Sequence, residues 1–186
     1  MGTDISVILE VRQDDGKWYE PESYNVPNYD FQDSLDYSTF PFNYRSYGLF
    51  GFLANIRNMH NIPSITDHRG LPEDSIWLEQ QTSDNNIFRE TNRQEALDGH
   101  YGHTWVTLQE LLDFAYDQVF EDRRSRNVLS NADNSVVIYS GSTMLKEGQG
   151  NMTNIRDFLG DFYFLQLEAL KTFGEPSNVR LIMYFD

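Results

Sequence analysis

A segment of alternating apolar and polar residues near the N-terminus is the sequence feature that most strongly constrains the fold of this chain. In residues 4–13 (DISVILEVRQ) every odd-numbered position from 5 to 11 is apolar, whereas most even-numbered positions are polar. This two-residue period predicts a β-strand with one buried face. Residues 14–16 (Asp-Asp-Gly) follow, and an Asp-Gly pair favours a tight turn because glycine tolerates a positive φ. The chain is therefore predicted to open with a β-hairpin that returns through residues 17–19.

A second strand is predicted at residues 178–185 (NVRLIMYF), where the odd-numbered positions from 179 to 185 are apolar. Arg180 lies between them, so we expect it to face the other way and to form an ion pair with Asp4. Strands near both ends with helices between them predict an α+β fold. We expect a mostly antiparallel sheet that contains the N-terminal hairpin and the C-terminal strand, with helices packed on one face. Residues 1–186 are expected to form a single domain.

Three segments are predicted to be helices because their apolar residues recur every three or four positions. Residues 47–58 read as a short amphipathic helix, whose two glycines would be explained by close approach to another element. In residues 107–120, Thr107 and Glu110 have the spacing of a capping box. Residues 153–173 are predicted to form a long amphipathic helix, and they carry the longest apolar stripe of the three.

The segments between these elements are less regular. Residues 21–44 contain three prolines and many aromatics, which indicates an ordered loop. Residues 80–98 are polar, with a frayed helix expected near residues 90–97. Residues 123–126 (RRSR) would place cations just beyond the end of a helix, where they complement its dipole. Residues 135–140 (SVVIYS) fit either a short strand or part of a helix.

The composition excludes several classes of protein. The chain has 186 residues, no cysteine, and 29 acidic against 14 basic side chains, which gives a net charge of −15. Without cysteine there is no disulfide framework, cysteine-ligated zinc or cysteine nucleophile. Duplex DNA and anionic membranes attract clustered cations, so neither is an expected partner. No apolar run approaches the ~20 residues of a membrane span, and no signal peptide is recognisable. We expect a cytoplasmic protein.

The negative charge is concentrated near the N-terminus. Residues 1–36 contain nine acids and two bases. Such a surface could bind a basic protein, in which case electrostatics would set the association rate and the specificity. The residues predicted for this interaction surface are Asp14, Asp15, Glu20, Glu22, Asp30, Asp33 and Asp36.

The densest group of functional side chains is residues 99–105 (GHYGHTW), directly before the Thr107 cap. N–H groups at a helix start attract anions, and nearby imidazole and indole rings can bind and stack on a ligand. The loop at residues 69–72 (RGLP) adds a guanidinium, which binds phosphate through two parallel hydrogen bonds. We therefore predict one concave site for a small nucleotide-like ligand. Its candidate residues are His103, Trp105, Arg69, His100, Arg45 and Arg57.

Each of these features also has a purely structural interpretation. His103 would then order its loop, and Trp105 would pack in the core at the helix start. Arg69 would pair with Glu73 or Asp74 in its own turn. These alternatives are at least as common as a binding site.

Neither metal binding nor catalysis has a clear signature. His100 and His103 have HxxH spacing, and His60 and His68 add two imidazoles, but no spacing typical of zinc ligands occurs. We expect no metal and no cofactor. No nucleophile motif, phosphate-binding loop or dinucleotide fingerprint is present either, so binding is favoured over chemistry. One catalytic alternative stays open, a hydrolase that uses His103 or His100 with an aspartate.

Five segments taken together resemble a known group of proteins. They are MGTDISVILEVR (residues 1–12), YRSYGLFGFLANIRN (44–58), RGLPED (69–74), GHTWVTLQELL (102–112) and VRLIMYFD (179–186). In this order they resemble uncharacterised bacteriophage and prophage accessory proteins, which open with Met-Gly-Cys-Asp-Ile-His. Thr3 and Ser6 stand where those proteins have Cys and His.

The resemblance implies a phage accessory protein and no particular reaction. We therefore expect a protein that interferes with a host function, including antiphage defence, in the cytoplasm of an infected bacterium. Three modes of action stay open at this point. They are capture of a small nucleotide-like ligand, binding of a basic host protein by an acidic or DNA-mimicking surface, and hydrolysis at a His/Asp site.

Overall fold

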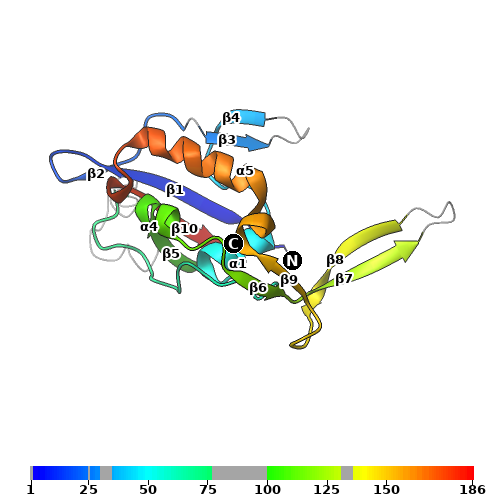
Figure 1. The fold of residues 1–186 in the computed structure, drawn as a ribbon. Helices are drawn as coiled ribbons and strands as arrows, with labels where there is room; N and C mark the ends of the chain where they lie inside the picture. The colour runs from blue at the N-terminus through cyan, green and yellow to red at the C-terminus, as the bar shows by residue number, and fades with distance from the viewer. Residues whose placement is uncertain (1, 25, 30–34, 77–99, 131–135) are drawn as a thin grey trace.

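The computed structural model describes residues 2–24, 26–29, 35–76, 100–130 and 136–186 (Figure 1). The frayed helix predicted near residues 90–97 lies outside these ranges, as do Asp30 and Asp33.

A four-stranded antiparallel sheet forms the centre of the molecule, in the order β2-β1-β10-β5. Its strands are β1 (Ile5–Arg12), β2 (Trp18–Tyr19), β5 (Tyr101–Thr107) and β10 (Val179–Phe185). The two predicted terminal strands are direct neighbours in this sheet, paired from Ile5 opposite Phe185 to Val11 opposite Val179. The predicted α+β fold with a mostly antiparallel sheet is confirmed.

The predicted hairpin between β1 and β2 is also confirmed. Gly16 has φ +79°, and its N–H donates to the carbonyl of Gln13 at 2.8 Å. The strand β5 was not predicted, because residues 99–105 were interpreted as a loop before a helix. Tyr101–Thr107 instead pairs along β10, with Val106 opposite Leu181.

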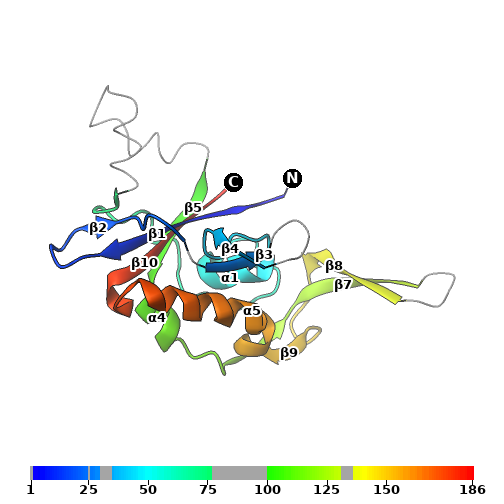
Figure 2. The same ribbon diagram turned by 90° about the horizontal axis from the view of Figure 1, so that it is seen from above.

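The helices cover one face of the sheet, as predicted (Figure 2). They are α1 (Tyr47–Ala54), α4 (Leu108–Asp113) and α5 (Ile155–Leu170). The odd-numbered residues of β1 and β10 point toward them; Phe185, for example, meets the ring of Phe50 edge-on with centroids 5.4 Å apart.

The helix predicted at residues 47–58 is shorter and is not amphipathic. All residues of α1 from Gly48 to Ala54 are buried, because the sheet, α5 and the following loop enclose it. The predicted close approach to another element is confirmed at Gly48, which faces α5, whereas Gly51 faces the turn that follows α1. A Cβ on Gly48 would lie 2.6 Å from the ring of Phe158, and one on Gly51 would lie 2.7 Å from the side chain of Asn58.

The helix predicted at residues 107–120 begins where expected but ends early. Thr107 and Glu110 form the predicted capping box, in which Glu110 N donates to Thr107 Oγ1 at 3.1 Å. The helix ends at Asp113, and β6 (Val119–Asp122) follows. Residues 119–122 are extended because their backbone bonds to β9 (Asn151–Asn154), a pairing that helical periodicity cannot reveal.

The long helix predicted at residues 153–173 is largely confirmed as α5. Asn154 caps it by accepting from Asp157 N at 2.7 Å, and a 3-10 turn extends it over Lys171–Phe173. Gly160 interrupts it with φ 74° and ψ 170°, which the apolar pattern did not indicate. A second 3-10 turn at Pro176–Asn178 leads into β10.

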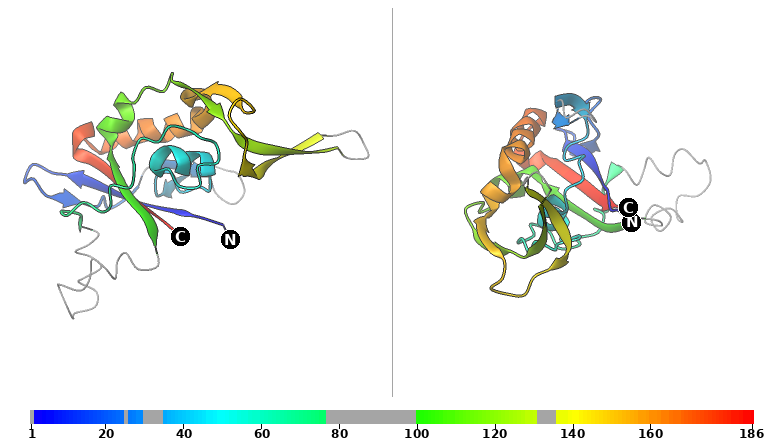
Figure 3. Two further views of the ribbon diagram at one scale, coloured as in Figure 1. Left: turned by 90° about the horizontal axis from the view of Figure 1, so that it is seen from below. Right: turned by 90° about the vertical axis from the view of Figure 1, so that its right-hand side faces the viewer.

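Two further hairpins were not foreseen as such. Residues 21–44, predicted to be a loop, contain β3 (Val26–Tyr29) paired with β4 (Leu35–Thr39). Residues 136–140 belong to β8 (Val136–Met144), which agrees with the strand alternative and pairs with β7 (Arg124–Ser130). Figure 1, Figure 2 and the left view of Figure 3 show this β7–β8 pair projecting from the body as an arm.

Candidate functional site

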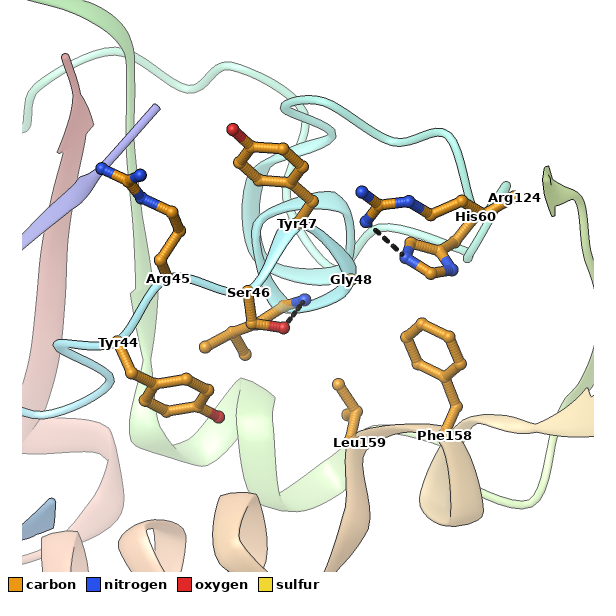
Figure 4. A pocket seen from close by; sticks show the side chains of 10 residues that line it. Tyr44, Arg45, Ser46, Tyr47, Gly48, His60, Arg124, Phe158 and Leu159 are labelled. Atoms are coloured by element: carbon orange, nitrogen blue, oxygen red, sulfur yellow. Dashed lines mark hydrogen bonds between the residues drawn. The ribbon is translucent and has the colours of Figure 1, made fainter. Parts of the chain in front are cut away.

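A pocket of about 480 Å³ lies at the N-terminus of α1, and we call it the α1 pocket (Figure 4). Phe158 and Leu159 from the start of α5 close it on one side, and Arg124 at the base of the β7–β8 arm closes it on another. The lining residues are Tyr44, Arg45, Ser46, Tyr47, Gly48, Leu49, His60, Arg124, Phe158 and Leu159.

The lining of the α1 pocket is cationic although the chain is strongly acidic. It contains two arginines and a histidine and no carboxylate, in a chain with 29 acidic residues. Arg45 forms an ion pair with Asp4 at 2.6 Å, where both side chains are more than half exposed. Arg124 makes no such ion pair among the described residues; its guanidinium lies 5.3 Å above the ring of Tyr47.

The start of α1 adds positive potential. Ser46 caps the helix, and its side chain accepts from Leu49 N at 3.3 Å. The N–H groups of Tyr47 and Gly48 belong to the first turn, where no intrahelical acceptor exists. Such groups carry the positive end of the helix dipole and favour an anion.

The turn after α1 brings His60 back beside Gly48. Asn58 holds this turn, since its side chain accepts from Ile62 N at 3.0 Å and donates to Ile62 O at 2.8 Å. The chain then joins the base of the arm, because Arg123 N donates to the carbonyl of His60 at 3.0 Å. A Cβ on Gly48 would lie 3.7 Å from the His60 ring.

His60 has a partner on each ring nitrogen. Its Nδ1 lies 2.8 Å from Asp122 Oδ1, and its Nε2 lies 3.2 Å from Arg124 Nη1. Since Arg124 can only donate, Nε2 accepts and Nδ1 carries the proton that binds Asp122. Burial lowers the pKa of His60, although the Asp122 carboxylate acts in the opposite direction. Both the lowered pKa and the two hydrogen bonds favour the ring with a single proton, on Nδ1.

The guanidinium of Arg124 uses only some of its hydrogen-bond donors within the described part of the protein. Its Nε donates to the carbonyl of Gly141 at 2.9 Å, and one Nη1 hydrogen binds His60. A guanidinium has five N–H groups. Among the described residues these two bonds leave up to three donors for a ligand.

A second pocket of about 580 Å³ adjoins the first, and we call it the β9 pocket. His60, Arg124 and Phe158 line both pockets. Its other lining residues are Asp122, Arg126, Asn151, Thr153 and Asp157.

Three of the predicted ligand residues lie together on the opposite face of the sheet. The guanidinium of Arg69 lies 5.2 Å over the Trp105 ring, and Gly70 N donates to the carbonyl of His103 at 3.0 Å. We call Arg69, His103 and Trp105 the sheet patch. Arg69 pairs with Glu110 at 2.8 Å, rather than with Glu73 or Asp74 as the structural alternative supposed.

His103 of the sheet patch and the nearby His100 are in different environments. The ring of His100 bonds to Asp186. His103 stacks on Tyr184 with centroids 6.0 Å apart, and its Nε2 is buried without a partner among the described residues. Burial lowers the pKa of His103, and the charge of His100 lowers it further.

Arg45 and Arg57, predicted to join these residues, lie elsewhere. Arg45 lines the α1 pocket, and Arg57 Nε donates to Thr3 Oγ1 at 3.0 Å. The six predicted ligand residues are thus divided between separate parts of the molecule.

The expected ion pair of Arg180 with Asp4 is wrong. Arg180 lies opposite Glu10 in the sheet and binds it at 2.7 Å, and it binds Asp74 at 2.8 Å. Asp4 lies six residues earlier on the chain than Glu10 and is paired with Arg45.

The predicted acidic surface is described only in part. Asp14, Asp15 and Glu22 are exposed on and just after the β1–β2 hairpin. Asp15 accepts from Tyr19 at 2.6 Å, and Glu20 accepts from the hydroxyl of Tyr24. The side chain of Asp36 lies outside the described part, as Asp30 and Asp33 do.

Sequence reasoning missed Arg124 and gave His60 only a weak role as a metal ligand. Residues 123–126 were assigned to a helix end, whereas they follow the strand β6. One local signal pointed to them. They place three arginines within four residues of an otherwise acidic chain, which is the kind of cluster that binds an anion.

Comparison of the chain with protein-family models, curated proteins and solved structures gives no match. Within the described residues, no group of three or more histidine or acidic side chains is placed to hold a metal ion. In the same part of the chain, every helix is too short or too polar to cross a bilayer.

Proposed function

We propose that this chain is a phage accessory protein that binds and sequesters a small phosphate-bearing ligand in the α1 pocket. The observation that carries the proposal is the charge of the lining, with two arginines and no carboxylate. The α1 N-terminus adds N–H donors to the same pocket. The resemblance of the sequence to phage proteins supports the biological setting.

The dimensions of the pocket agree with this ligand class. A volume of about 480 Å³ lies within the roughly 300–1,000 Å³ of typical small-molecule sites. Tyr44, Tyr47 and Phe158 supply aromatic surface, against which an organic group attached to phosphate can pack.

Calorimetric titration with pyrophosphate tests the proposal. We expect the wild type to bind, and Arg124→Ala to bind about 10–100-fold more weakly, because a hydrogen bond to a charged group contributes about 1.5–3 kcal/mol. Arg69→Ala is the matched control, since it removes a guanidinium from the sheet patch and should leave the affinity unchanged.

Two results of this titration would contradict the proposal. One is the absence of pyrophosphate binding by the wild type. The other is a loss of affinity in Arg69→Ala with none in Arg124→Ala, which would move the site to the sheet patch. A second experiment tests sequestration itself. A nucleotide is added to the protein, the protein is denatured, and the released compound is identified. A chemically altered nucleotide would show catalysis instead of sequestration.

A further inference from the structure

We propose that the ligand is a phosphorylated ribose unit that spans both pockets, with its phosphate in the α1 pocket and its sugar in the β9 pocket. This inference rests on the proposed function and adds the class and the orientation of the ligand. Free ribose phosphates and nucleotides share this chemistry.

The first argument is space. The α1 and β9 pockets measure about 480 and 580 Å³ and share His60, Arg124 and Phe158. A phosphate group fills only a small part of the first volume, so a ligand attached to it has room to continue. The shared residues make the β9 pocket the adjoining space.

The second argument is the change in chemistry from one pocket to the other. Both pockets have two arginines, but the α1 pocket has no carboxylate. In the β9 pocket Arg126 is paired with Asp122 at 3.4 Å, and the lining adds Asn151, Thr153 and Asp157. These side chains accept and donate hydrogen bonds as sugar hydroxyls require. Asp157 also repels a phosphate, so the phosphate is favoured in the α1 pocket.

The carboxylates of the β9 pocket differ in their availability. Asp122 is 5% exposed and already binds His60 and Arg126. Asp157 is exposed, and its Oδ2 accepts one bond from Asn154 Nδ2 at 2.8 Å. A carboxylate has about four acceptor sites, so Asp157 can accept further bonds from a vicinal diol.

The shared residues suit the junction between phosphate and sugar. Arg124 has donors left for a phosphate oxygen on the side of the α1 pocket. Phe158 offers an apolar ring to the C–H face of the sugar, and the ring packs edge-on against His60 and Phe120 with centroids 4.9 and 5.2 Å away.

The test is calorimetric titration of the full chain with inorganic phosphate, ribose 5-phosphate and AMP. We expect ribose 5-phosphate to bind about tenfold or more tightly than phosphate, as one charge-assisted hydrogen bond provides. Asp157→Ala should lose this advantage and bind phosphate at least as tightly as the wild type, because a repelling charge is gone.

Two further variants complete the design. Asn151→Ala should also reduce the advantage of ribose 5-phosphate, and it leaves the capping interactions of α5 intact. Asp161→Ala removes an exposed carboxylate of α5 that lines neither pocket, and it should retain the advantage in full.

The outcomes separate the two proposals. Equal affinities for phosphate and ribose 5-phosphate would overturn this inference and leave the proposed function standing. No binding of phosphate or pyrophosphate would overturn both. If the advantage is present and depends on Asp157, tighter binding of AMP than of ribose 5-phosphate identifies a nucleotide, and equal binding identifies a sugar phosphate.

Discussion

At the scale of single residues, the protonation of His60 follows from its neighbours. Asp122 fixes the proton on Nδ1, and Arg124 occupies Nε2. Burial keeps the pKa of the ring below its ordinary value. An anion in the α1 pocket would change this balance, because it withdraws Arg124 toward itself and favours a positive imidazole.

Anion binding is therefore expected to depend on pH. Because a bound anion raises the pKa of His60, binding takes up a proton. Affinity therefore increases as the pH falls through the raised pKa of the complex, and it levels off below the lower pKa of the free protein. Sulfate is the suitable probe, since its charge is constant over this range. We expect its affinity to rise by at most about tenfold per pH unit, between the pKa of His60 in the complex and its lower pKa in the free protein. His60→Gln should remove most of this slope, and an unchanged slope would show that another group takes up the proton.

At the scale of elements, local signals predicted the starts of helices better than their ends. The capping box of α4 involves residues three positions apart, so Thr107 and Glu110 could be recognised from the sequence. Residues 119–122, which were predicted to continue this helix to residue 120, are instead held extended by β9, about 30 residues further along the chain. Such a distant partner leaves no local periodic signal. The strand β5 was missed for the same reason, because its partner β10 lies at the other end of the chain.

The capping box of α4 gives one prediction. Thr107→Ala should lower the free energy of unfolding by about 1 kcal/mol, because the Glu110 N–H loses its acceptor. Chemical denaturation measures this loss, and Thr107→Ser is the control that retains the hydroxyl and most of the stability. Equal stability of all three proteins would contradict a stabilising role of the cap.

The contact between α1 and α5 gives another prediction. In Gly48→Ala the new Cβ meets the Phe158 ring at 2.6 Å, so we expect a loss of about 1–3 kcal/mol of stability from overpacking. Phe158→Leu in the same chain removes the obstructing ring. The double variant should then be less destabilised than the sum of the two single variants, and strict additivity would contradict the close contact.

At the scale of the whole molecule, the sequence predicted that the two terminal strands share a sheet but not which side chains meet across the fold. Both terminal strands were recognised from their two-residue period. The candidate site depended on contacts between distant segments, and the predicted ligand residues were accordingly divided. His60, Asp122 and Arg124 come together only because β6 and the arm lie against the turn after α1.

A buried ion pair connects distant parts of the chain on the outer face of the sheet. Glu10 and Arg180 are 0% and 3% exposed, and Arg180 also reaches Asp74 and the ring of Trp18. Glu10→Ala should cost about 3–5 kcal/mol in chemical denaturation, because it leaves a buried guanidinium without its buried partner. Asp74→Ala removes an exposed partner and should cost clearly less; an equal cost would contradict the role of burial.

The most direct test of the α1 pocket is a titration of the isotope-labelled protein with pyrophosphate, followed by NMR. Three reporters lie at the pocket, the Gly48 amide, the His60 ring and Arg124 Nε. Two lie at the sheet patch, the Trp105 indole N–H and the His103 ring. We predict saturable chemical-shift changes at the first three and none at the other two. Shifts confined to Trp105 and His103, or no shifts at all, would contradict an anion site at the N-terminus of α1.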